Sequence, residues 1–85
     1  MSTVERTVTV ETTNGLHVRT ASAIGSAAAE VDADVTIGVD GDWASATNSL
    51  NLVALNVPHG ESVRVRATGP DAEHAVTSVS AALSE

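Results

Sequence analysis

The sequence predicts a small α+β domain in which helices cover one face of a four-stranded, antiparallel or mixed sheet, while the other face stays in water. Three observations predict this class. Four segments alternate apolar and polar residues with a period of two, as half-buried strands do. Three other segments repeat apolar residues at helical spacing. The segments follow one another in the order β-α-β-β-α-β-α, and 85 residues suit a single domain over residues 1–85.

The first strand is expected over residues 3–11, where Arg6 is the one polar residue in the apolar phase. The apolar members of this alternation are Val4, Val8 and Val10. A polar turn over 12–15 follows, and the period then changes to that of a helix over 17–30. Gly25 interrupts this helix and lowers its propensity. The apolar positions are Ala21, Ile24, Ala28 and Val31.

Period two returns in the middle of the chain, at Val35, Ile37 and Val39. Asp40-Gly41 then predicts a two-residue hairpin, and 42–46 is the returning strand. In this strand Ala44 and Ala46 should face inward and Trp43 outward. Asn48 can cap a short helix that carries apolar side chains. These side chains are Leu50, Leu52, Val53 and Leu55.

The last third contains a turn, a strand and a helix. Pro58-His59-Gly60 is typical of a turn, and Gly69-Pro70-Asp71 of a helix start. The strand between them carries Val63, Val65 and Ala67 on its apolar side. The apolar stripe of the final helix contains Ala72, Ala75, Val76, Val79, Ala82 and Leu83.

The composition excludes several classes of protein. The chain has eleven acidic residues, four arginines and no lysine, with a net charge of −7, which argues against nucleic-acid binding. Cysteine is absent, so disulfides, thiol chemistry and thiolate metal sites are excluded. There is no apolar run of transmembrane length and no leading signal segment, so we expect a soluble, cytoplasmic protein that does not insert into a membrane.

The acidic excess without lysine also predicts a halophilic protein, kept soluble in high salt where self-repulsion is screened. An ordinary acidic bacterial protein is the alternative. The core must be built from valine, leucine, isoleucine and many alanines, because Trp43 is the only aromatic residue. Small side chains bury little area, so we expect marginal stability in low salt.

The candidate site centres on His17, which a turn pair places at the start of the predicted helix. Unpaired backbone N–H groups of the first turn, at Val18 and Arg19, could bind a phosphate on its ring, and the Arg19 guanidinium could neutralise that phosphate. Imidazole is a neutral nucleophile near pH 7. The simpler alternative is a helix-start residue with a local hydrogen bond.

No other residues assemble an active site. His59 in its turn and His74 on the polar side of the last helix are expected in solvent, without metal-ligand spacing to His17. There is no glycine-rich phosphate loop, no P-loop lysine and no serine–histidine–acid set. Neither a metal nor a cofactor is expected, and the domain would need partners that supply and accept a phosphoryl group.

The hexapeptide from Asn14 to Arg19 resembles the active-site signature of the HPr family, the histidine phosphocarriers of the sugar phosphotransferase system. The resemblance extends over nearly the whole chain, through the length, the element order, the Asp-Gly hairpin and the leucine-rich short helix. It implies an open-faced β-sandwich, with a four-stranded antiparallel sheet and three helices on one face. It also implies phosphorylation of Nδ1 of His17 and identifies Arg19 as the active-site arginine.

The partners that the resemblance implies are enzyme I, charged from phosphoenolpyruvate, as donor, and a sugar-specific enzyme IIA, with the fructose type among the candidates, as acceptor. The protein would be a monomeric carrier and not a stand-alone enzyme. Val18, Leu50 and Val53 could form the docking patch for both partners. The alternatives are a regulatory binding module that uses the same surface and a carrier for a dihydroxyacetone-kinase-type relay.

Two positions depart from the family motif: Val18 stands where alanine is usual, and Thr20 where proline is usual. Thr20 keeps an N–H and a hydroxyl, so the helix start could be looser or could hold the phosphate differently. Some family members carry a regulatory serine at the start of the short helix. Asn48 falls at that position and Ser49 one residue later, so we do not expect this regulation to carry over.

Overall fold

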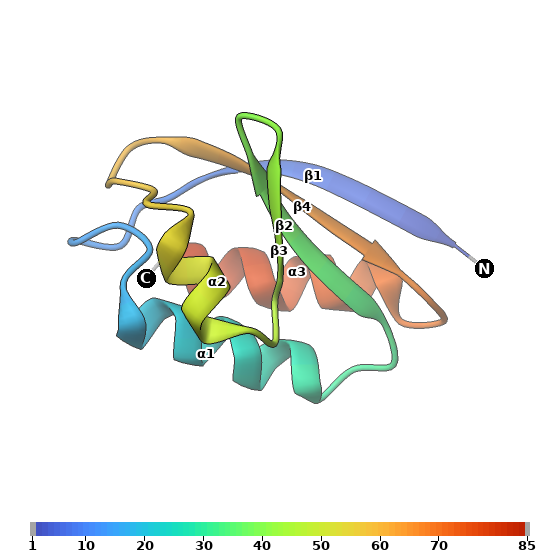
Figure 1. Cartoon of the computed structure of the whole chain (residues 1–85). Coiled ribbons are helices and arrows are strands. Elements are labelled where there is room, and N and C mark those ends of the chain that lie inside the picture. Colours follow the sequence, from blue (N-terminus) through green and yellow to red (C-terminus); the bar gives the residue numbers. More distant parts are fainter. Residues whose placement is uncertain (1, 85) are drawn as a thin grey trace.

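The computed structural model describes residues 2–84, which form four strands and three helices in the predicted order. The strands are β1 (Thr3–Thr9), β2 (Asp34–Val39), β3 (Asp42–Ser45) and β4 (Ser62–Thr68). The helices are α1 (Val18–Ala29), α2 (Ser49–Ala54) and α3 (Ala72–Leu83). The sheet order is β1-β4-β2-β3, and every pair of neighbours is antiparallel. Figure 1 shows the three helices on one side of this sheet, as predicted.

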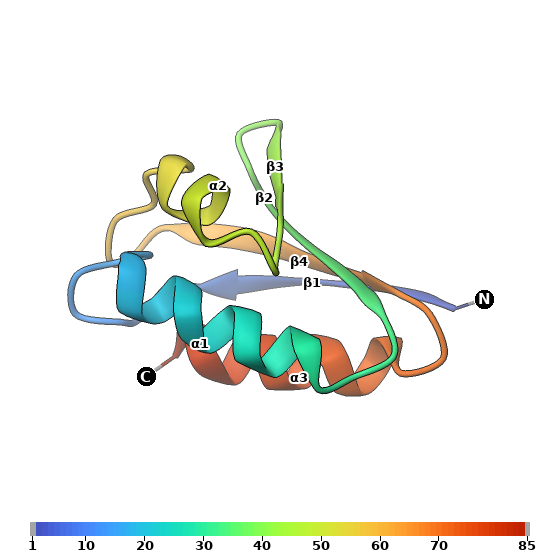
Figure 2. The same ribbon diagram turned by 60° about the horizontal axis from the view of Figure 1, so that its bottom comes forward.

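The helices form a second layer under the sheet. Helices α1 and α3 run side by side, and the short α2 packs against α1 and the end of β3 (Figure 2). The N-cap of α2 is Asn48, as predicted. The Asn48 Oδ1 accepts a hydrogen bond from the Asn51 N–H at 3.1 Å. The buried side chains between the layers are small or aliphatic, and the largest fully buried ones include Ile24, Ile37, Leu52 and Leu83. The described core therefore contains no aromatic ring.

The first strand is two residues shorter than predicted. It ends at Thr9, which pairs with Ser62, the first residue of β4, and the next two residues bond outside the paired strands. The Val10 N–H donates to the Glu61 carbonyl at 2.8 Å, and the Glu11 N–H donates to the Leu83 carbonyl at 2.9 Å. The alternation still continues through the buried Val10, so the predicted burial is right although the strand is not.

The hairpin between β2 and β3 has the predicted turn and the predicted faces. Asp40 and Gly41 have φ values of 51° and 87°, which two-residue hairpins of this kind need at both central positions. Ala44 and Ala46 are buried, and Trp43 lies on the outer face with 38% of its surface exposed.

A charged cluster holds the Trp43 ring on the outer face. The Arg66 guanidinium lies 4.2 Å from the ring centroid and that of Arg64 lies 5.5 Å from it. Both Nε groups donate to the Glu5 carboxylate, at 2.8 Å from Arg64 and 2.9 Å from Arg66. These hydrogen bonds hold the pKa of Glu5 below its usual value, and the bond from Arg64 has the larger effect. Gly38 faces Trp43 across the β2–β3 pair, and a Cβ there would lie 2.6 Å from the indole.

Candidate functional site

A tight turn over residues 12–16 sets the position of His17. The Gly15 N–H donates to the Thr12 carbonyl at 3.0 Å, and the Thr12 hydroxyl donates back to the Gly15 carbonyl at 2.6 Å. The same carbonyl accepts the Thr20 hydroxyl at 3.4 Å and the His17 N–H at 3.1 Å. Thr12 and Thr20 are both buried, so these bonds are shielded from water. The carbonyl of Gly15 is thus the point to which the loop and the helix start are both tied.

The loop before β4 presses against this turn. Gly15 has a φ of 71°, and a Cβ on it would lie 2.3 Å from the Val57 carbonyl oxygen. The Leu16 N–H donates to that oxygen at 2.9 Å. His59 Nδ1 lies 3.1 Å from the Thr12 carbonyl oxygen, which holds the two loops together at a second point. Only glycine allows this close approach, because any side chain would displace backbone atoms.

His17 is the N-cap of α1, so it lies at the helix start as predicted. Its backbone is extended, with φ −103° and ψ −175°, and its carbonyl accepts the Ala21 N–H at 2.9 Å. Its Nδ1 accepts the Arg19 N–H at 3.2 Å. An acceptor nitrogen carries a lone pair, so in the neutral ring the proton is on Nε2. Nδ1 therefore carries the lone pair that a nucleophilic nitrogen needs.

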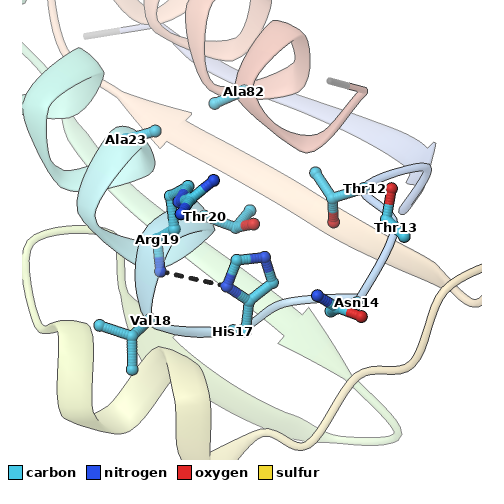
Figure 3. A pocket seen from close by; sticks show the side chains of 9 residues that line it. All are labelled: Thr12, Thr13, Asn14, His17, Val18, Arg19, Thr20, Ala23 and Ala82. Atoms are coloured by element: carbon cyan, nitrogen blue, oxygen red, sulfur yellow. Dashed lines mark hydrogen bonds between the residues drawn. The ribbon is translucent and has the colours of Figure 1, made fainter.

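The His17 ring faces an open hollow beside the N-terminus of α1. Figure 3 shows the ring between the Arg19 and Thr20 side chains and the turn that carries Asn14. The Arg19 side chain lines the hollow, is exposed and forms none of the ion pairs found within residues 2–84. The first turn of α1 contains no acidic residue. An anion in the hollow would therefore meet a helix N-terminus and a free guanidinium with no carboxylate in that turn.

A second hollow lies against the same histidine, toward α2. It is lined by Asn14, Leu16, His17, Val53, Asn56, Val57 and Pro58. Val53, from the predicted docking patch, thus borders a hollow that His17 also borders. The other two members of that patch are exposed apolar side chains, Val18 at 70% and Leu50 at 84%. The structure leaves both uncovered, as a docking surface requires.

The remaining candidates do not line the hollows beside His17. His59 and His74 are exposed and line neither hollow. Ser49 is the exposed first residue of α2. In the described part of the chain, no group of three histidine or acidic residues could hold a metal ion. No helix within the same residues is both long and apolar enough to cross a membrane.

Sequence reasoning missed the residues that hold the site in place. The sequence indicates only a polar turn at Thr12 and a turn over Pro58-His59-Gly60, and neither pattern predicts a contact with Gly15. The hydrogen bond between Leu16 and Val57 joins positions more than 40 residues apart, whereas the Thr12 hydroxyl bonds to a carbonyl only three residues away. The one local signal was Thr20, where the family motif usually has proline.

Comparisons with known proteins show similarity over nearly the whole chain. A family model described as "PTS HPr component phosphorylation site" matches residues 4–85. The phosphocarrier protein HPr of Haloferax volcanii is 43% identical over 83 residues, which cover 95% of this chain and 93% of that protein. HPr from Bacillus anthracis superposes with a TM-score of 0.91 at 28% identity, over 98% of this chain and 99% of that one. The phosphoryl donor subunit of a PEP-dependent dihydroxyacetone kinase from Pantoea ananatis is 38% identical over 80 residues, but these cover only 17% of its length.

Proposed function

This chain belongs to the HPr family, and from that premise we propose that His17 Nδ1 is the atom that carries the phosphoryl group. The protein is a phosphocarrier of the phosphoenolpyruvate-dependent phosphotransferase system and not an enzyme in its own right. The observation that supports the assignment is the hydrogen bond from the Arg19 N–H to Nδ1. It supports the assignment because an accepting Nδ1 carries a lone pair, and His17 lies at a helix start beside an open hollow.

The transfer is a displacement at phosphorus. The Nδ1 lone pair forms a bond to the phosphorus held by enzyme I, and the bond from phosphorus to the donor breaks with its electron pair leaving on the donor. The ring becomes an imidazolium and is neutral again once Nε2 releases its proton to water. The Arg19 N–H loses Nδ1 as its acceptor and can then donate to a phosphoryl oxygen. Passing the group to an enzyme IIA reverses these changes.

The Val18 N–H and the Arg19 guanidinium complete the proposed phosphate contacts. The Val18 N–H lies in the first turn of α1, where the N–H groups have no carbonyl partner within the helix. Arg19 is exposed and without an ion pair among the described residues, so its side chain is free to reach a phosphoryl oxygen in the hollow. No metal or cofactor is required, because the charge of the phosphoryl group meets protein donors.

Labelling with phosphoenolpyruvate and enzyme I tests the site. His17→Ala should abolish incorporation, whereas the matched variants His59→Ala and His74→Ala should be labelled like the wild type. The label should be acid-labile, as a phosphoramidate is. Labelling of His17→Ala at the wild-type level would refute the assignment.

The role of Arg19 has its own test. Arg19→Ala should slow transfer by about tenfold or more, because a charge-assisted hydrogen bond to the reacting group is lost. Circular dichroism should show an unchanged fold, since the side chain is exposed. A transfer rate equal to that of the wild type would exclude this role.

The partner surface is proposed to be the patch of Val18, Leu50 and Val53. Like other HPr proteins, the chain interacts with enzyme I and enzyme IIA-type proteins. We expect Leu50→Ser to weaken binding of enzyme I without loss of stability, because 84% of Leu50 is exposed. Chemical-shift mapping with enzyme I should perturb residues 17–24 and 48–54. Shifts confined to the outer sheet face would place the interface elsewhere.

The acceptor distinguishes the carrier from the alternatives. We propose that the acceptor is an enzyme IIA, and the fructose type should be tested first. We also propose that the protein is a cytoplasmic, monomeric phosphoprotein that works in high salt. Label discharged by an enzyme IIA indicates a flux carrier, and label discharged only by a dihydroxyacetone-kinase system indicates that relay. Label that no acceptor removes indicates a regulator. The low coverage of the dihydroxyacetone-kinase relative makes that relay the weaker candidate.

A further inference from the structure

The start of α1 holds one more backbone N–H donor besides those of Val18 and Arg19. The first N–H of the helix region to reach a backbone carbonyl is that of Ala21, which donates to His17. The Arg19 N–H donates to the His17 ring. Among residues 2–84, the N–H groups of Val18 and Thr20 meet no acceptor. Thr20 therefore presents an unused N–H at the third position of the helix.

The Thr20 side chain is fixed, so its N–H is held in place. Only 4% of the residue is exposed, and its hydroxyl donates to the Gly15 carbonyl at 3.4 Å. Thr20 also lines the hollow that the His17 ring faces (Figure 3). Its hydroxyl thus bonds to the turn, whereas its backbone N–H has no acceptor among the described residues.

We propose that the Thr20 N–H is a third backbone ligand of the phosphoryl group on His17, beside those of Val18 and Arg19. This inference rests on the proposed function of His17. An N-cap side chain normally accepts from the N–H of the second or third helical residue, which here are Arg19 and Thr20. His17 Nδ1 uses the second in the free protein. A phosphoryl group on Nδ1 carries three oxygens beyond that nitrogen, so the third N–H comes within its reach.

The residue at this position decides whether the donor exists. Proline, which the family motif usually has here, carries no N–H and cannot bind an oxygen in this way. Threonine supplies the N–H. A proline ring would make the helix start rigid, and in this chain the hydrogen bond from the Thr20 hydroxyl to the Gly15 carbonyl takes that role. An additional donor stabilises the dianionic form of the phosphoryl group, so the pKa of its second ionisation should fall.

The test compares Thr20→Pro with Thr20→Val. Both variants lose the hydroxyl, but only proline also loses the N–H, so the difference between them isolates the donor. Proline is compatible with the first turn of a helix, so we expect the variant to fold. In a mixture buffered by enzyme I, phosphoenolpyruvate and pyruvate, Thr20→Pro should hold about three- to tenfold less phosphoryl group than Thr20→Val, as for one partly exposed charge-assisted hydrogen bond. The pKa of its phosphoryl group, measured by ³¹P NMR, should be the higher of the two.

A direct measurement on the wild type keeps the inference testable if Thr20→Pro does not fold. The amide proton of Thr20 should move strongly downfield when His17 is phosphorylated, while a control amide such as that of Gly41 should not move. An unmoved Thr20 amide in a protein labelled on His17 would overturn this inference and leave the proposed function intact. A wild-type protein that is never labelled on His17 would overturn both.

Discussion

Replacing Gly15 with alanine should disrupt the site more than any comparable glycine change. The new Cβ would lie 2.3 Å from the Val57 carbonyl oxygen and 2.9 Å from two backbone atoms of Pro58. All three are backbone atoms, so no side-chain rotation can relieve the overlap. The two loops must separate, which breaks the 2.9 Å hydrogen bond from the Leu16 N–H to Val57.

The cost has two parts. The left-handed backbone at φ 71° costs about 1 kcal/mol for alanine. Loss of the loop contact adds about 1–3 kcal/mol, for the hydrogen bond and the displaced packing around it. The free energy of unfolding should therefore fall by about 2–4 kcal/mol, a large share of the roughly 5–10 kcal/mol typical of a domain of this size.

Gly41→Ala is the matched control. Gly41 also has a positive φ, of 87°, but a Cβ there meets nothing within 4 Å. The free energy of unfolding of Gly41→Ala should fall only by the cost of the left-handed backbone, about 1 kcal/mol. Urea unfolding at a fixed, high KCl concentration, followed by far-UV circular dichroism, measures both variants. If Gly15→Ala were no less stable than Gly41→Ala, the close approach of the two loops would not hold the turn, and the reasoning would fail.

Three further predictions concern the rest of the molecule. The melting temperature should rise steeply from tens of millimolar to molar KCl, because salt screens a net charge of −7, and a salt-independent melting temperature would exclude the halophilic interpretation. Gly38→Ala should shift the Trp43 fluorescence spectrum and destabilise the protein by about 1–3 kcal/mol, since a Cβ would lie 2.6 Å from the ring, whereas an unchanged spectrum would contradict this packing. The lowered pKa of Glu5 means that its contribution to stability is complete above pH 4.5 and is lost as the pH falls through the folded-state value. Urea midpoints of Glu5→Gln should accordingly depend less on acid than those of the wild type, and equal acid dependence would argue against the bridge.

The parts of the fold that the sequence predicted are those with local causes. Asp40-Gly41 fits only a narrow set of turns, and Asn48 caps the helix that directly follows it. A turn pair and a change of period meet at His17 and predict a helix start there. In each case the residues that determine the structure lie within a few positions of it.

The parts that could not be predicted depend on contacts between distant segments. Asp71 is the N-cap of α3, yet its carboxylate caps nothing in that helix and instead accepts the Asp32 N–H at 2.9 Å. The contact of Gly15 with Val57 and the bridge from Glu5 to two arginines are of the same kind. Periodicity indicates which face a residue occupies but not which partner it meets, so these contacts appear only in three dimensions.

Arg6 shows how the open edge of the sheet is protected. β1 is an edge strand, and Arg6 lies in the same phase as the buried Val8 but is exposed. If a strand from another chain paired with this edge, its side chains would extend the inner face of the sheet beyond β1. They would cover the Arg6 guanidinium and remove its charge from water. The exception in the apolar alternation therefore disfavours edge-to-edge aggregation, and Arg6→Val should make the protein more prone to form fibres or precipitates in the high salt that favours apolar contact.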